Sequence, residues 1–560
     1  MKNSFKTTIL IIVISCGFYA CTEDYFEFDK LKTDDWRPVI AVPLVNSSLS
    51  IADLVTKKNS EGFIQTNADN NLEVVYKSSV ISSDGQDIIA FPPQIFKDSF
   101  ETPFPIPSFP PLNTGQKLPF SSPIDLSFED PSQFGIVVDS ITLKSGSLSF
   151  TFENTFKYEI TINARFRTFT DSLGDTLVLN YILPASNGTI PSVRSETVEL
   201  KGYQINMSED KDGNPADNRI PIDLNYEIQL IAGVGSSPGE KVRMTGAITN
   251  LEFNEFYGSM GSTPLNIEKD SIAIDFFKNF QAFSSADFFI SNPSLLLTVK
   301  NSFSGPMNFE FLYLDAINSG RNPSVVNFNI PIELQPLAVN FPAKYGIVET
   351  KFELNRNNSN IDSVLSHLVQ AIKYDSKAQF NPGGVPPRTG IRRNFMTDTS
   401  DMRLDLEFRI PFEGRAVGFF IEDTVAFEFE NSGELNNGVL RLIAENSFPL
   451  AIDLQISFLD SSKNKITDLI LPSDPDFSNG YGALIPGAPI NSAGESNGSS
   501  SKTKDISISR AQLEQLSDSK FIALSSKLST TKGDIGANVV FRSDNRLNII
   551  LGLKSEILID

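Results

Sequence analysis

The sequence has few of the residues from which catalytic and metal sites are usually built. It holds two cysteines and one histidine in 560 residues. Cys16 and Cys21 both lie near the start, so the rest of the chain can form no disulfide and supply no thiolate ligand. His367 stands alone, which excludes multi-histidine metal centres and leaves a nucleophile triad no second candidate for its base. We therefore expect a protein without enzyme activity and without a cofactor or metal.

Long basic and long apolar runs are also missing. Lysine and arginine occur at most in pairs such as Arg392-Arg393, and the formal net charge is −21. Such a chain repels phosphate backbones, so nucleic acid is a poor candidate partner. Beyond the first 21 residues, no stretch approaches the length of a transmembrane helix.

The first residues have the pattern of a secretory signal. Lys2 and Lys6 precede an uncharged run of 14 residues at positions 7–20. Fourteen residues are too few to span the roughly 30 Å of hydrocarbon in a bilayer. Residues 1–20 are therefore predicted to be a signal peptide.

The end of this leader resembles a lipobox, in which a cysteine receives diacylglycerol and becomes the first residue of the mature chain. Ala20 supplies the small residue before Cys21, although Phe18 replaces the usual leucine. The segment Val13-Ile14-Ser15-Cys16 fits the local pattern better, but it would shorten the apolar run to about nine residues. We expect lipid on Cys21 and anchoring of the chain in a bilayer.

An acidic tether is expected at residues 21–35. Glu23 and Asp24 directly follow Cys21, which resembles the signal that exports lipoproteins of the Bacteroidota to the outer face of the outer membrane. The resemblance implies a cell-surface lipoprotein of the outer membrane. A solvated tether without an export role is the alternative.

An internal repeat is the most informative feature of the remaining chain. Three segments of alternating apolar residues end in Asn154-Thr-Phe, Asn301-Ser-Phe and Asn446-Ser-Phe, and their asparagines lie 147 and 145 residues apart. Alternation is typical of strands with one buried face, and a period of this length is that of a whole domain. We expect the three asparagines to hydrogen-bond backbone groups at equivalent strand ends, because polar groups beside buried phenylalanine need partners.

The predicted fold class is therefore all-β, with tandem β-sandwich-like domains and few short helices. The expected units are a Phe/Pro-rich β region at 36–135 and β-domain repeats at 136–260, 261–415 and 416–560, the last of which we expect to fold alone. Two short helices are predicted, one capped by Asp362 and covering 363–372, the other capped by Ser509 and covering 512–516.

One loop gathers oxygen donors of the kind that calcium prefers. Asp210, Asp212, Asn214 and Asp217 lie within eight residues. The spacing departs from an EF-hand, since glycine stands at the fourth position and Pro221 at the twelfth. A calcium loop and a turn closed by Asp and Asn side chains are the two interpretations.

Six triplets of Asp, then Ser or Thr, then an aliphatic residue resemble the O-glycosylation sequence of exported Bacteroidota proteins. The alternative is that three of them merely repeat a strand entry and one caps a helix. The candidate acceptors are Ser140, Ser172, Thr176, Ser271, Ser363 and Thr424.

Two resemblances bear on function. The leader, the Trp36-Arg-Pro opening and the Asn-Ser-Phe strands resemble uncharacterised surface lipoproteins of the Bacteroidota, and the asparagine strand resembles late-embryogenesis-abundant type 2 sandwich domains over about 20 residues per repeat. We expect a non-catalytic lipoprotein that is a binding or structural component of the outer membrane or cell surface, with another outer-membrane protein as one candidate partner. The alternative is a glycan-binding or carbohydrate-active lipoprotein associated with an uptake system, which a cluster of exposed aromatic side chains would favour.

Overall fold

Alternating apolar and polar residues make strands the predominant structure of the described chain, which confirms the all-β prediction. The computed structural model describes residues 39–557 apart from positions 51–62, 83, 90, 109–114, 129–133, 275–280, 319–324, 368, 385–392, 427–434 and 478–479. Cys21, Glu23 and Asp24 therefore lie outside the described residues. Within the described part, no helix is long and apolar enough to cross a membrane.

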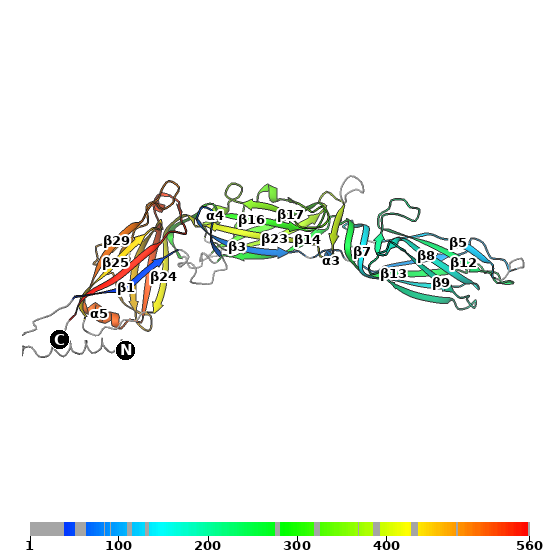
Figure 1. Ribbon diagram of the computed structural model, residues 1–560, viewed down its shortest axis with the longest axis horizontal. Coiled ribbons are helices and arrows are strands. Elements are labelled where there is room, and N and C mark those ends of the chain that lie inside the picture. Colours follow the sequence, from blue (N-terminus) through cyan, green and yellow to red (C-terminus); the bar gives the residue numbers. More distant parts are fainter. Residues whose placement is uncertain are drawn as a thin grey trace, which may run out of the picture.

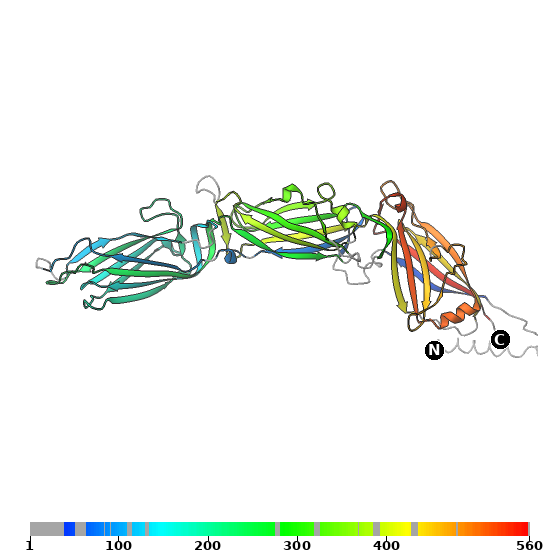
Figure 2. The same cartoon turned by 180° about the vertical axis from the view of Figure 1, so that it is seen from behind.

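Three β-sandwich lobes follow one another in a row (Figures 1 and 2). We call them proximal, middle and distal, where the proximal lobe holds both ends of the described chain. In each lobe one sheet contains the strand that ends in the repeated asparagine, and we call it the asparagine sheet. The other is the facing sheet.

The distal lobe shows the common plan. Its asparagine sheet has the strand order β10 (Ser192–Glu199), β7 (Val137–Asn154), β13 (Val242–Ser259), β4 (Gln94–Phe100). Its facing sheet has the order β9 (Thr176–Leu183), β8 (Glu159–Thr170), β12 (Arg219–Gln229), with β5 (Lys117–Ser121) and β6 (Ile124–Ser127) on the far side of β12. A short strand, β11 (Gln204–Asn206), bonds to β7 and to β8 and so links the two sheets.

The middle lobe repeats this order. Its asparagine sheet runs β20 (Val348–Leu354), β16 (Ser294–Asn301), β23 (Met402–Pro411), β3 (Leu72–Ile81), β2 (Phe63–Thr66). Its facing sheet has β17 (Met307–Asn318), β21 (Val369–Phe380) and β14 (Pro264–Ala273), with β18 (Val325–Asn327) and β19 (Leu337–Val339) on the free side of β17.

The proximal lobe has the same arrangement with one added strand. Its asparagine sheet runs β29 (Ser500–Ile508), β25 (Leu435–Asn446), β32 (Leu547–Ile557), β1 (Val39–Leu49). Its facing sheet runs β26 (Leu450–Leu459), β30 (Phe521–Thr530), β24 (Glu413–Ala426), β15 (Gln281–Ile290), and the short strands β27 (Lys465–Asp468), β28 (Ala483–Ile485) and β31 (Val539–Val540) pair at its margins.

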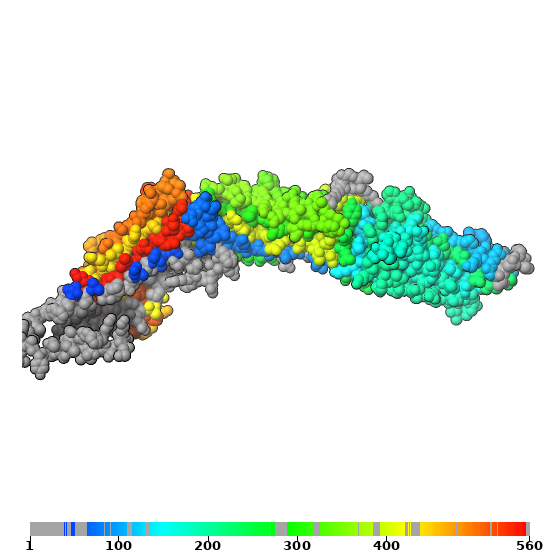
Figure 3. All heavy atoms as spheres, viewed as in Figure 1, coloured from blue at the N-terminus to red at the C-terminus, as the bar shows by residue number. Residues whose placement is uncertain are grey.

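The sheets do not follow the predicted boundaries of 36–135 and 416–560. The opening section is not a separate unit, because β1 and β4 form an edge strand of the proximal and distal asparagine sheets, and β3, with β2 outside it, pairs with β23 in the middle one. Figure 3 shows this section, in blue, along the side of the proximal and middle lobes. The proximal lobe in turn needs β1 and β15, which lie far upstream of residue 416, so residues 416–560 hold only part of a sandwich.

The described helices are short. α5 (Arg510–Ser517) follows Ser509 as predicted but is longer than the predicted 512–516; the Ser509 amide donates to Gln512 Oε1 and the Gln512 amide donates to Ser509 Oγ. α4 (Ile361–Leu365) differs from the prediction: Asn360 is its N-cap, Asp362 lies inside it, and it ends early because the alternating residues from Val369 onward pair with β17 as β21. α3 (Gly85–Ile88) is a single turn between β3 and β4.

The three repeated asparagines are fully buried and occupy equivalent environments, which confirms the prediction. Each ends its strand, and its Oδ1 accepts the backbone amide two residues later at 2.9 Å. Their Nδ2 groups donate to backbone carbonyls on the far side of the strand end: those of Tyr158 and Pro184 for Asn154, Asn340 for Asn301, and Leu450 and Pro486 for Asn446. One side chain thus satisfies backbone groups of two or three chain segments where the sandwich closes.

Continuous packing joins neighbouring lobes. Between the distal and middle lobes, β22 (Asn394–Thr397) pairs with β13, and the nearly buried Arg393 bonds Asp139 at 3.1 Å. Between the middle and proximal lobes, the amides of Leu72, Phe412 and Phe541 donate in a cycle to one another's carbonyls. Hydrogen bonds thus connect each lobe to the next.

Replacing Asn154 with Ala should lower the unfolding free energy of the distal lobe by about 2–4 kcal/mol, because a buried amide and two carbonyls lose their partner. Asn180→Ala, at an exposed position of the same lobe, is the matched control and should change stability by less than about 0.5 kcal/mol. Denaturant unfolding followed by hydrogen exchange measures both. Equal effects of the two substitutions would contradict this role of Asn154.

Residues 413–557 alone should unfold without a cooperative transition, because β32 then exposes the backbone groups that pair with β1. Val39 lies opposite Glu556 and Leu49 opposite Leu547, so a short Gly/Ser linker from residue 557 to residues 39–49 would restore that pairing as a hairpin. The permuted fragment should gain a cooperative transition in circular dichroism. If both fragments unfold alike, the edge strand is dispensable.

Candidate functional site

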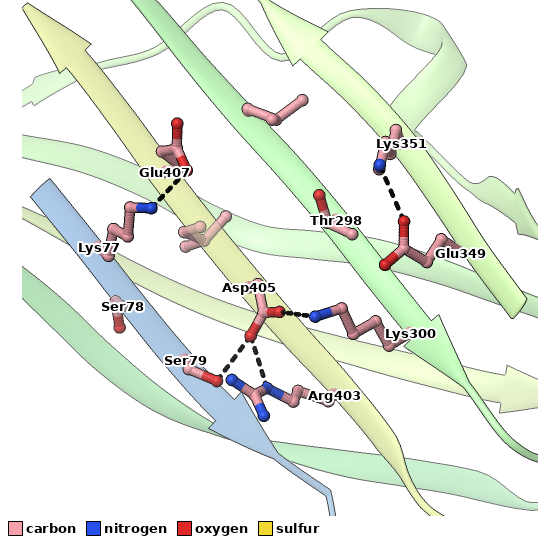
Figure 4. Close-up of a pocket in the computed structure, with 12 residues that line it drawn as sticks. Lys77, Ser78, Ser79, Thr298, Lys300, Glu349, Lys351, Arg403, Asp405 and Glu407 are labelled. Atoms are coloured by element: carbon pink, nitrogen blue, oxygen red, sulfur yellow. Dashed lines mark hydrogen bonds and ion pairs between the residues drawn. The ribbon is translucent and has the colours of Figure 1, made fainter. Parts of the chain in front are cut away.

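A hollow on the outer face of the middle asparagine sheet is the candidate site. Its volume is about 440 Å³, and it lies across β3, β23, β16 and β20 (Figure 4). Strand register explains its composition, because residues directly opposite one another on neighbouring strands point to the same face. One row across the sheet holds Ser79, Asp405, Thr298 and Lys351. The flanking rows add Arg403, Lys300 and Glu349 on one side and Lys77, Glu407 and Leu296 on the other.

The charges in this hollow pair with one another. Asp405 accepts from Lys300 at 2.8 Å, from the Arg403 guanidinium at 2.7 Å and from the Ser79 hydroxyl at 2.7 Å (Figure 4). Glu407 lies 3.1 Å from Lys77 and 2.6 Å from Arg409. Lys351 and Glu349 form a third group at 2.8 Å. Every carboxylate of the hollow therefore has a cation beside it.

The pairing shifts the protonation of these carboxyls. Partial burial alone would raise the pKa of Asp405, but hydrogen bonds from Lys300, Ser79 and Arg403 favour the carboxylate and lower the pKa to about 2. The pKa of Glu407 is lowered in the same way, since Arg409 and Lys77 outweigh burial. Lys351 lowers the pKa of Glu349. Groups held as carboxylates do not act as general acids near neutral pH.

Chemically, the hollow can offer hydrogen bonds and a mixed-charge surface. Its side chains are Lys, Arg, Asp, Glu, Ser, Thr and Leu, and the acidic ones are already bonded to cations. The sequence shows the alternation of Arg403, Asp405, Glu407 and Arg409 along one strand, but their partners lie on strands that only the register brings alongside. This is why inspection of the sequence missed the site.

The candidate calcium loop forms a turn closed by side chains. Asp210 Oδ1 accepts the amides of Asp212 and Asn214 at 3.0 and 2.8 Å, and its Oδ2 accepts the Asn214 amide group at 3.3 Å. These bonds lower the pKa of Asp210, with the Asn214 amide as the largest cause. Asp217 is exposed and follows this turn.

The same turn recurs elsewhere, with an Asp or Asn oxygen accepting the amides two and four residues later. Within the described ranges, no group of three or more His, Cys, Asp or Glu is placed to hold a metal ion. The pattern that suggested calcium is thus a means of closing loops in this protein. Its other examples begin at Asn67, Asp171, Asp460 and Asn491.

The candidate glycosylation residues lie at separate places in the fold. Ser172, Ser271, Ser363 and Thr424 are exposed, whereas Ser140 and Thr176 are half-buried in β7 and β9. His367 is exposed after α4, and its Nδ1 lies 2.8 Å from the Ser363 carbonyl oxygen. The structure brings none of these described residues into the hollow.

Comparisons with known proteins give little beyond this geometry. No family model matches the chain, and no curated protein matches it. Among solved structures, a putative secreted protein from Parabacteroides distasonis is similar over 52% of this chain and 82% of its own, with 12% identity and a TM-score of 0.30. The infectious bursal disease virus Gx strain structure matches over 91% of this chain and 85% of its own, with 10% identity and a TM-score of 0.13. Likenesses this low carry no functional argument.

Asp405→Asn should lower the free energy of unfolding at neutral pH, and this destabilisation should disappear in acid. A carboxyl whose folded pKa of about 2 lies below the unfolded value near 3.9 stabilises the fold above about pH 4, and the stabilisation disappears as the pH falls towards 2. The difference in unfolding free energy between the wild type and the variant should therefore shrink between pH 5 and pH 2.5. Asp534→Asn, at an exposed position of the proximal lobe, is the control. A difference that stays constant with pH would contradict the assigned ion cluster.

Proposed function

We propose that this chain is a non-catalytic, lipid-anchored surface protein whose three lobes carry a binding or structural surface away from the outer membrane. The observation that carries the proposal is the position of the chain ends. Val39 and Glu556 are paired on neighbouring strands of the proximal lobe, and the distal lobe lies at the other end of the row (Figure 1).

A membrane anchor upstream of β1 would determine which end of the row of lobes faces the bilayer. Cys21 precedes Val39 by 18 residues, so a lipid on Cys21 would place the proximal lobe next to the bilayer. The distal lobe would then project farthest from it. The joined lobes support this role, because hydrogen bonds at both junctions connect each lobe to the next.

The polar chemistry of the middle lobe supports a role without catalysis. The carboxylates of the hollow are bonded to lysine and arginine, and the Asp405 pKa of about 2 keeps that group ionised at neutral pH. A surface of this kind contributes solubility and contact. We infer that the protein acts by contact with a partner in the cell envelope or outside it.

A glycan-binding function is the second candidate, and exposed aromatic side chains favour it. Tyr257 is 43% exposed and Tyr345 58% exposed, and both lie where the distal and middle lobes meet. Aromatic rings that remain accessible beside polar groups suit sugars, which offer C–H groups on the faces of their rings and hydroxyls at the edges.

Cys21→Ala should abolish fatty-acid labelling and release the protein from the membrane, whereas Cys16→Ala should leave both unchanged. Two or three acyl chains hold a soluble body on a bilayer, since each buried CH₂ contributes about 0.8 kcal/mol. Metabolic labelling and membrane fractionation measure the two properties. Label that persists on Cys21→Ala protein would overturn the lipid site.

Replacing Glu23 and Asp24 with Ala should keep the lipid and reduce exposure of the protein at the cell surface, because these charges would act as the export signal. Protease accessibility on whole cells reports the exposure, with the Cys16→Ala protein as the reference. Unchanged accessibility would make the two residues a simple tether.

A further inference from the structure

The chain upstream of residue 39 joins the folded body at one strand, β1. In the described part of the proximal asparagine sheet, β1 is the edge strand and pairs only with β32. It runs along the lobe from Val39, beside Glu556, to Leu49, at the junction with the middle lobe (Figure 1). Any pull on the upstream chain, including that of an anchor at Cys21, therefore enters the body through β1.

The covalent connection from β1 to the middle lobe is longer than the gap that it bridges. Leu49 and Ile64 pack in one hydrophobic cluster with Leu72 and Phe448, so the two ends of this connection lie close together. The 14 residues at positions 50–63 can reach about 45 Å when extended. While β1 stays in place, this connection carries no tension, and a pull on β1 does not pass along it.

The pull must instead cross from β1 to β32 and leave through the proximal sandwich. β15 and β24 continue by short chain segments into β16 and β23 of the middle lobe, and they do so at the end where Ile290 lies opposite Gly414. At the same junction the amides of Leu72, Phe412 and Phe541 donate to one another's carbonyls. The pull therefore enters the proximal lobe at one end of its strands and leaves at the other.

This geometry loads the pairing of β1 and β32 in shear. Ten register pairs, from Val39 with Glu556 to Leu49 with Leu547, join two strands that are pulled in opposite directions along their axes. Hydrogen bonds of an antiparallel pair are perpendicular to the strands, so such a pull loads all of them together. A pull that separated the two strands from one end would break the same bonds one after another. The chain thus enters the lobe in the direction that resists a pull best.

We propose that β1 is a mechanical clamp, a strand loaded in shear that transmits tension between the membrane anchor and a partner held by the outer lobes. Above the rupture force, β1 leaves β32, and the tension passes to residues 50–62 while the middle and distal lobes stay folded. The inference rests on the proposed function only for the source of the tension, because the clamp itself needs no lipid.

Release of the clamp has a defined length. The 24 residues at positions 39–62 reach about 80 Å when extended, and β1 in place already spans about 37 Å of that distance. The molecule therefore gains about 45 Å between its anchor and its middle lobe when β1 is released. The proximal lobe then lies outside the path of the tension, so its own unfolding adds nothing to this gain.

Single-molecule force spectroscopy tests the shear geometry in the full chain with both natural cysteines replaced by Ala, so that no lipid is present. One thiol handle is Thr33→Cys, upstream of β1. The second handle is either Asp544→Cys, exposed just before β32, or Asp560→Cys, just after it. The Asp544 handle pulls β1 and β32 in opposite directions along their axes, whereas the Asp560 handle separates them from one end. At equal pulling speed the first rupture force should be about threefold higher with the Asp544 handle, and equal forces would overturn the clamp.

A third handle tests the route of the tension. Thr189→Cys is an exposed position of the distal lobe, so handles at Thr33 and Thr189 load the whole row of lobes. The traces should contain an event that lengthens the molecule by about 45 Å at the force of the shear geometry. Traces without this event would show that the tension bypasses β1 and would overturn the proposal. Failure of the anchor is a separate result, because membrane retention of Cys21→Ala protein would remove the lipid site and leave these forces unchanged.

Discussion

Each sandwich of this molecule has an edge strand from the opening section of the chain, and the architecture depends on that constraint. β1, β3 and β4 bond along the asparagine sheets of the proximal, middle and distal lobes before the rest of any lobe has been reached in sequence. The chain therefore runs to the far end of the row, builds the distal lobe there, and completes the middle and proximal lobes on its return, with β15 added to the proximal lobe before β16 begins. This route brings Val39 opposite Glu556 and makes the distal lobe remote from both described chain ends.

The sequence predicted the parts of the fold that depend on local pattern. Alternation indicated strands, the 147- and 145-residue spacing indicated three similar units, and the demand of buried amides for partners indicated the role of Asn154 and its two equivalents. It could not predict which strands pair. Alternation at residues 39–49 is compatible with any sheet edge, and nothing local indicates a partner some 500 residues later. α4 was overestimated for a related reason, since its second half is taken by sheet pairing.

For the candidate surfaces too, the sequence predicts what depends on local pattern and does not predict what depends on strand pairing. The sequence shows that charged residues alternate along one strand, at Arg403, Asp405, Glu407 and Arg409. The hollow forms only because strand register places Lys300 and Lys351, from two other strands, next to these residues. At Asp210 the local pattern suggested a calcium site that the structure does not form. Its carboxylate accepts hydrogen bonds from backbone amides of its own turn instead.

Both the direction of the anchor and the remote position of the distal lobe follow from the path of the opening section along the three lobes. Dipolar coupling between spin labels tests it directly in the full chain with Cys16 and Cys21 replaced by Ala. Ala41 and Lys554 are exposed partners on β1 and β32, and Lys97 and Thr245 are partners on β4 and β13. Labels on each pair should show the strong coupling of neighbouring strands. Weak coupling between Ala41 and Lys554, with strong coupling between Lys97 and Thr245, would mean that the opening section does not pair with the proximal lobe and would contradict this path.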